Sequence, residues 1–107
     1  MKNLLIILIM IMFSNVKAQS VVFDNKEVPV KNNTKISNNI VNKAVLNAIT
    51  ETKNLVDPSV KFRPLSASVY NVSGFKVYVT YDSKKEGQAT IIYTITFLFD
   101  ENYNIIK

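Results

Sequence analysis

The hydrophobic period of this chain changes once, at Asp57-Pro58. Before that point apolar residues recur every three or four positions, which is typical of one face of an amphipathic helix. These residues are Ile40, Val41, Ala44, Val45, Ala48 and Ile49. Ser37 stands where an N-cap would begin this helix, with a hydroxyl able to accept from a free backbone N–H. The helix must end before Asp57, because proline cannot continue it.

After Pro58 the period is two, which is typical of half-buried strands. Four strands are predicted, over Val60–Tyr70, Phe75–Tyr81, Thr90–Phe99 and Tyr103–Ile106. Pro64 indicates an edge or a bulge in the first of them. The run from Ile91 to Phe99 would be an aggregation hazard at an edge, so we expect it inside the sheet. One helix followed by antiparallel strands predicts an α+β fold, with the helix packed across a four- to five-stranded antiparallel sheet.

The first 35 residues contain two different kinds of segment. Met1 to Ala18 has Lys2, an apolar run of about 10 residues, and then compact side chains at positions 16 and 18. Because crossing a bilayer takes about 20 apolar residues, this segment is predicted to be a cleaved signal peptide rather than an anchor or a buried helix. Residues 19–107 would then form one secreted domain, extracellular or, in a bacterium, periplasmic. Within Gln19 to Lys35, Val21 to Phe23 is a candidate strand and Val28-Pro29-Val30 is predicted to be extended.

The charge of the chain argues against nucleic acid as a partner. The 107 residues carry 13 basic and 8 acidic side chains, a net charge of +5. Without Lys2 and Lys17, the remaining 11 basic and 8 acidic residues give +3. No run of basic residues is longer than Lys84-Lys85, so the pattern is that of a solvated surface. After signal cleavage no membrane segment is expected.

The chain contains neither cysteine nor histidine. The commonest general base, the Ser-His and Cys-His nucleophile pairs and the usual zinc ligands are therefore missing. The acidic residues are scattered, so we expect no enzyme activity, no metal and no cofactor. Such a domain must fold by apolar burial and act through its shape.

The stretch from Ser68 to Tyr81, SVYNVSGFKVYVTY, places one of the chain's two glycines between two alternating runs. Glycine tolerates a positive φ, so Gly74 predicts a tight hairpin, and this role alone would explain it. The order of helix, hairpin and strands over residues 21 to 107 resembles the cystatin family of cysteine-protease inhibitors. The family has a Gln-x-Val-x-Gly motif in its first hairpin. Here Val72 and Gly74 match that motif, and Tyr70 replaces the glutamine.

The resemblance implies a steric wedge that fills the cleft of a papain-type cysteine protease. The first hairpin would supply Tyr70, Asn71, Val72, Ser73 and Gly74, and the second turn would supply Tyr103. Val21 and Val22 would act as an extended N-terminal trunk, although an edge strand or a disordered segment explains them equally well. The chain departs from the family by lacking a glycine in this trunk and the Pro-Trp pair of the second hairpin. The alternative function is therefore a secreted, non-inhibitory binding module on a cystatin-like scaffold.

Two N-x-[ST] sequons begin at Asn32 and Asn71. In a eukaryote, a glycan on Asn71 would lie on the proposed wedge and obstruct it. The protein is expected to be a monomer or a dimer that exchanges its first hairpin.

Overall fold

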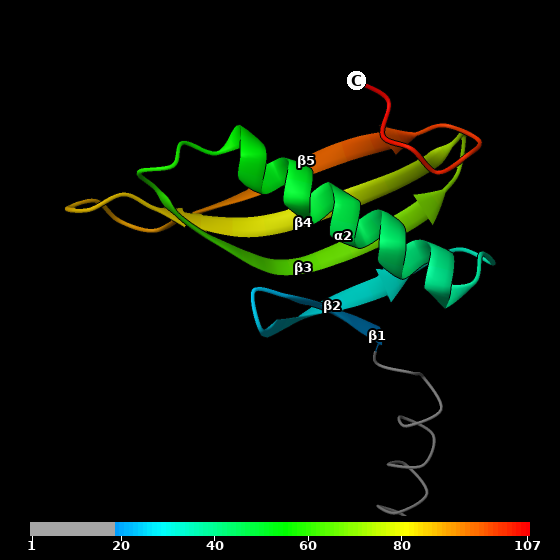
Figure 1. The fold of residues 1–107 in the computed structure, drawn as a ribbon, viewed down its shortest axis with the longest axis horizontal. Coiled ribbons are helices and arrows are strands. Elements are labelled where there is room, and N and C mark those ends of the chain that lie inside the picture. The colour runs from blue at the N-terminus through cyan, green and yellow to red at the C-terminus, as the bar shows by residue number, and fades with distance from the viewer. Residues whose placement is uncertain (1–18) are drawn as a thin grey trace, which may run out of the picture.

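The structure, a computed structural model, describes residues 19–107; the predicted signal peptide lies outside the described residues. Five strands and one helix follow in the order β1 (Gln19–Phe23), β2 (Lys26–Asn32), α2 (Asn38–Leu55), β3 (Lys61–Asn71), β4 (Phe75–Lys84) and β5 (Ile91–Phe99). The strands form one sheet in chain order, and α2 lies lengthwise across one of its faces (Figure 1). The predicted α+β class, with one helix packed on a sheet, is confirmed.

The sheet is mixed, so the prediction of a purely antiparallel sheet is wrong. β2 runs parallel to β3, with Val30 opposite Ala67 and Asn32 opposite Val69. The other neighbouring strands are antiparallel. The cause is the position of the helix: α2 carries the chain back across the sheet, so the strands before and after it run the same way. The sequence does not indicate this pairing, because residues 24–32 show no strong strand pattern.

Helix α2 begins and ends where its sequence predicts. Ser37 occupies the N-cap position in an extended conformation, and its carbonyl accepts a hydrogen bond from Val41 N–H at 3.1 Å. The predicted bond to the Ser37 hydroxyl is not formed. The chain entering the helix is instead held by Asn32, whose Oδ1 accepts from Thr34 N–H at 3.0 Å and whose Nδ2 donates to the Ile36 carbonyl at 3.1 Å.

This asparagine gives a first prediction. Asn32→Ala should lower the free energy of unfolding by about 1–3 kcal/mol, because the half-buried backbone groups that it binds lose their partners. Asn33→Ala is the matched control, since Asn33 is exposed and its side chain makes only a long 3.5 Å bond to the Lys31 carbonyl; the bond from its backbone N–H to the Val69 carbonyl is kept in the variant. Urea denaturation followed by circular dichroism measures both. Equal effects would contradict the role given to Asn32.

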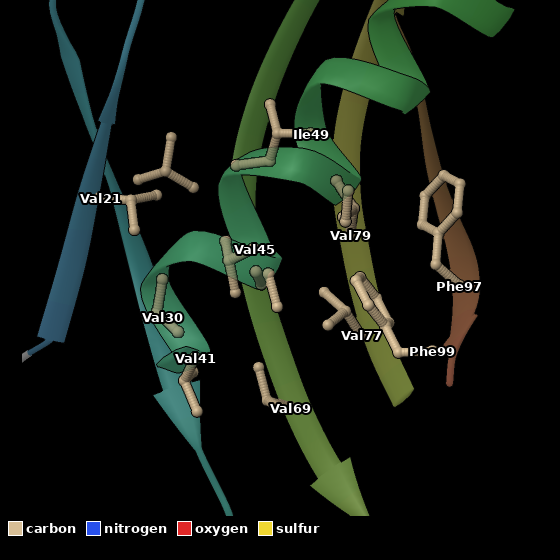
Figure 2. Packing of buried hydrophobic residues seen from close by; sticks show 14 of the residues in the cluster. Val21, Val30, Val41, Val45, Ile49, Val69, Val77, Val79, Phe97 and Phe99 are labelled. Carbon is tan, nitrogen blue, oxygen red and sulfur yellow. The ribbon is translucent and has the colours of Figure 1, made fainter. Parts of the chain in front are cut away.

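The core lies between α2 and the sheet face that it covers. Val41, Val45 and Ile49 of the helix are fully buried and face the strands (Figure 2). The strands contribute Val21, Val28, Val30, Ala67, Val69, Phe75, Val77, Val79, Phe97 and Phe99. Most of these side chains are β-branched, which suits a pleated surface. Ile40, expected on the same helix face, is exposed.

A bulge interrupts β3 where Pro64 predicts an edge or a bulge. The register of β3 with β4 shifts between Pro64 and Ser66. On the face away from the helix, the Arg63 guanidinium donates to the carboxylate of Asp82, with Nε 2.9 Å from Oδ2. This hydrogen bond, followed by the charge of the carboxylate, raises the pKa of Arg63. Asp82 is thus a buried charged residue with a partner.

Two predictions about the end of the chain are wrong. β5 pairs with β4 alone among the strands and forms an edge of the sheet, because the strands lie side by side in chain order. Tyr103–Ile106 does not form a strand; a single bridge joins Ile105 to Phe99. The positive φ of 62° at Tyr103 turns the chain at that point.

Candidate functional site

Two turns lie next to each other at one end of the sheet (Figure 1). Residues 72–74 connect the end of β3 at Asn71 to β4, and residues 100–103 follow β5. Both turns line one shallow depression, the first through Asn71 and Gly74 and the second through Asp100, Glu101 and Tyr103. We call this surface, residues 71–74 with 100–103, the two-turn end.

The first turn is shaped by two residues with positive φ. Asn71 pairs with Phe75, which leaves Val72, Ser73 and Gly74 as the loop. Ser73 has a φ of 56° and Gly74 one of 114°. The value at Gly74 suits glycine, and the space around its Cα is open, so backbone conformation rather than crowding requires this residue. The Val72 side chain is 72% exposed, and Tyr70, Asn71 and Ser73 are also exposed.

The second turn is organised by Asp100. Its Oδ1 accepts from the N–H groups of Asn102 at 2.9 Å and Asn104 at 3.0 Å. Its backbone N–H donates to the Asn104 carbonyl at 2.9 Å, and its carbonyl accepts from Tyr103 N–H at 3.0 Å. Four hydrogen bonds within five residues fix the backbone of the turn that carries Tyr103.

An aromatic cluster joins the two turns. The Phe75 ring lies 5.3 Å from Phe99 and 5.2 Å from Tyr103, centroid to centroid, and both contacts are edge-to-face. Such pairs contribute about 0.5–1.5 kcal/mol each beyond burial. Neither Phe75 nor Asp100 was among the predicted site residues. The sequence offers a weak signal for each: an aromatic residue directly after Gly74, and an aspartate with asparagines two and four positions later.

The proposed trunk residues lie elsewhere. Val21 is 4% exposed and belongs to the core, whereas Val22 is 61% exposed on the opposite face of β1. Their distance from the two-turn end follows from the strand register. Val21 pairs with Val28, which lies two residues before Val30 on β2, and Val30 pairs with Ala67 on β3. Asn71, at the two-turn end, lies a further four residues along β3 from Ala67. With a rise of about 3.3 Å per residue, Val21 and Val22 lie roughly 20 Å short of the two-turn end along the strands. The structure brings Asn71 and Gly74 together with Tyr103, but not with Val21 or Val22. Tyr70 lies apart from Tyr103, because its ring packs edge-to-face on Tyr78 with the centroids 5.5 Å apart.

The two sequon asparagines have different surroundings. Asn71 is exposed at the two-turn end. The Asn32 amide is half-buried and donates to the Ile36 carbonyl and to Asn38 Oδ1, both at 3.1 Å. A glycan on Asn32 would have to replace these bonds.

Within residues 19–107, no three His, Cys, Asp or Glu side chains gather into a candidate metal site. The largest hollow, about 960 Å³ and open, lies beside the β2–α2 connection, where Asn32 and Thr34 bond each other. No helix of the described chain has the length and apolar character needed to cross a bilayer.

Comparison with protein-family models, curated proteins and solved structures finds no match to this chain.

Proposed function

We propose that this protein acts as a steric inhibitor of papain-type cysteine proteases, with the two-turn end as the inserted surface. The observation that carries the proposal is the shared depression between residues 71–74 and 100–103. A wedge needs at least two projecting turns at one end of a rigid sheet. The aromatic contacts of Phe75 supply the rigidity, which lowers the ordering cost of binding.

The contacts would be apolar and through the backbone. Val72 would place its exposed side chain in the protease cleft, and Gly74 would let the backbone approach the cleft wall without a Cβ between them. Tyr103 would contact the cleft from the second turn, with its ring held against Phe75. Because no strand end would enter the cleft as an extended substrate, the inhibitor would offer no scissile bond at the catalytic thiolate.

A glycine pair tests this proposal. Gly74→Glu should weaken the inhibition of papain or a cathepsin by about tenfold or more, because it adds charge and bulk at the tip of the wedge. Gly87→Glu is the matched control: Gly87 also has a positive φ, 79°, and open space at its Cβ position, but it lies in the β4–β5 connection. Both substitutions place a side chain at a positive φ, but 79° lies nearer than 114° to the left-handed region that other residues adopt, so circular dichroism must show that both variants are folded. The measurement is a titration of active-site-calibrated protease.

Inhibition by the natural sequence at submicromolar concentration, lost in Gly74→Glu and kept in Gly87→Glu, supports the wedge. Absence of inhibition at high micromolar concentration by the natural sequence would refute it. Equal loss in both variants would show that the effect comes from backbone strain rather than from contact.

A second function, a non-inhibitory binding module, is favoured by the position of β1. Val21 belongs to the core and Val22 lies far from the two-turn end, so β1 would add no third contact to a cleft. Such a module would use the same two turns to bind a partner that has a shallow surface. Binding to a protease at micromolar concentration without loss of its activity would favour this function over inhibition.

A further inference from the structure

Two hydrogen bonds show which backbone groups of β5 point away from β4, toward the open edge of the sheet. Ile106 N–H donates to the Leu98 carbonyl at 2.8 Å, and Asp100 N–H donates to the Asn104 carbonyl at 2.9 Å, both on the side away from β4. In an antiparallel strand the N–H and C=O of every second residue point to the same edge. The backbone groups of Ile92, Thr94 and Thr96 therefore also point away from β4, where the described chain places no other strand.

The C-terminal residues cover only the end of this edge, at Leu98 to Asp100, and the rest has none of the usual features that prevent strand pairing. β5, with the sequence IIYTITFLF, contains no charged residue and no proline. Its register with β4 runs without a bulge from Ile91 to Phe99. Apolar side chains are exposed on both faces at its start, where Ile91 is 49%, Ile92 66% and Tyr93 45% exposed. Proteins that remain monomeric usually protect such an edge with lysine, proline or a bulge.

We propose that β5 pairs antiparallel with β5 of a second copy of this chain, about a two-fold axis at Thr94. The pairing extends the sheet across both copies and leaves the two-turn end of each copy outside the contact. It exchanges no strand between the copies. The proposal is independent of the proposed function.

The register follows from which backbone groups are free. With the axis at Thr94, Thr94 faces its own symmetry mate and Ile92 faces Thr96 of the other copy, so all three outward-pointing residues find partners. An axis at Ile95 would instead bring Ile92 opposite Leu98, whose carbonyl is already bound by Ile106. The residues after Asp100 thus close the end of the edge and leave residues 92–96 as the pairing segment.

A second copy fits this edge better than a charged partner does. Two uncharged strands bring no like charges into opposition, although the domain as a whole is basic. On the helix side, the same axis places Tyr93 opposite Ile95 of the other copy. Tyr93, which α2 leaves exposed, would then be covered by an apolar side chain.

Charged substitutions of Thr94, which faces its own symmetry mate, test the proposal. The protein is purified from expression of the full chain, its N-terminus is read by mass spectrometry, and its mass in solution is measured by sedimentation velocity from micromolar to high micromolar concentration. The natural sequence should form dimers. Thr94→Lys and Thr94→Glu should each weaken dimerisation by about tenfold or more, because like charges face each other across the axis. An equimolar mixture of the two variants should recover the dimer.

Thr94→Val is the matched control. It removes the 3.1 Å contact between the Thr94 and Thr80 hydroxyl groups, as the charged variants do, but it adds no charge and should still dimerise. Circular dichroism confirms that each variant is folded. A natural sequence that stays monomeric at high micromolar concentration would overturn the proposal. So would a dimer that both charged variants retain, since that dimer would use another surface or exchange its first hairpin.

Discussion

Ile49→Ala should lower the free energy of unfolding by about 2–5 kcal/mol, among the largest effects of any single truncation in this domain. Ile49 is fully buried in the middle of α2 and faces the sheet (Figure 2). Its replacement removes buried methyl groups and leaves a cavity that neighbouring valines, which have few rotamers, fill poorly. Urea denaturation followed by far-ultraviolet circular dichroism measures the loss.

Leu55→Ala is the control for this experiment. Leu55 is the last residue of the same helix and is exposed, so its truncation should change the stability by no more than about 0.5 kcal/mol. Similar losses at the two positions would mean that this face of α2 does not form the core contact.

A comparable loss of stability is expected in β1, the edge strand at the opposite side of the sheet from β5. Val21→Asp should cost on the order of 3–5 kcal/mol, because it places a carboxylate among the apolar side chains of the core without a partner. Val22→Asp should cost less than about 1 kcal/mol, since that side chain points to solvent on the other face of β1. Thermal unfolding of the two variants provides the comparison.

This pair also separates a structural role from a binding role. A stable, folded Val21→Asp protein that had lost partner binding would show that Val21 contacts the partner and not the core. A folded Val22→Asp protein with unchanged protease inhibition would agree with a wedge made of the two-turn end alone.

The helix and the strands after it could be predicted from sequence because each carries its own period. Five of the six apolar positions of α2, all except Ile40, share one buried face only because the segment is helical, and Pro58 marks its end. The alternation in Phe75–Tyr81 likewise requires a strand. These signals are local, so each element can be predicted without knowing which strand it pairs with.

The arrangement of the sheet depends on pairings that no local pattern records. Val28 and Val30 are separated by a proline and flanked by charged residues, so β2 showed a weak pattern, and its parallel pairing with β3 could not be inferred. The apolar run of β5 predicts a strand but not its neighbours, which is why its edge position was missed. For the site, Gly74 marked the first turn, but Val21 and Val22 alternate in a segment too short to show which of them faces the core.

The parallel junction between β2 and β3 has a consequence for the order of assembly. It consists of three residue pairs, and the first of them, Val30 with Ala67, closes a loop that contains the whole of α2. β3, β4 and β5 are joined by short connections, so they can pair with one another with little loss of chain entropy. We therefore expect docking of the β1–β2 hairpin to be the slow, late event of folding, and until it occurs the helix and β3 would keep a strip of apolar surface open to solvent.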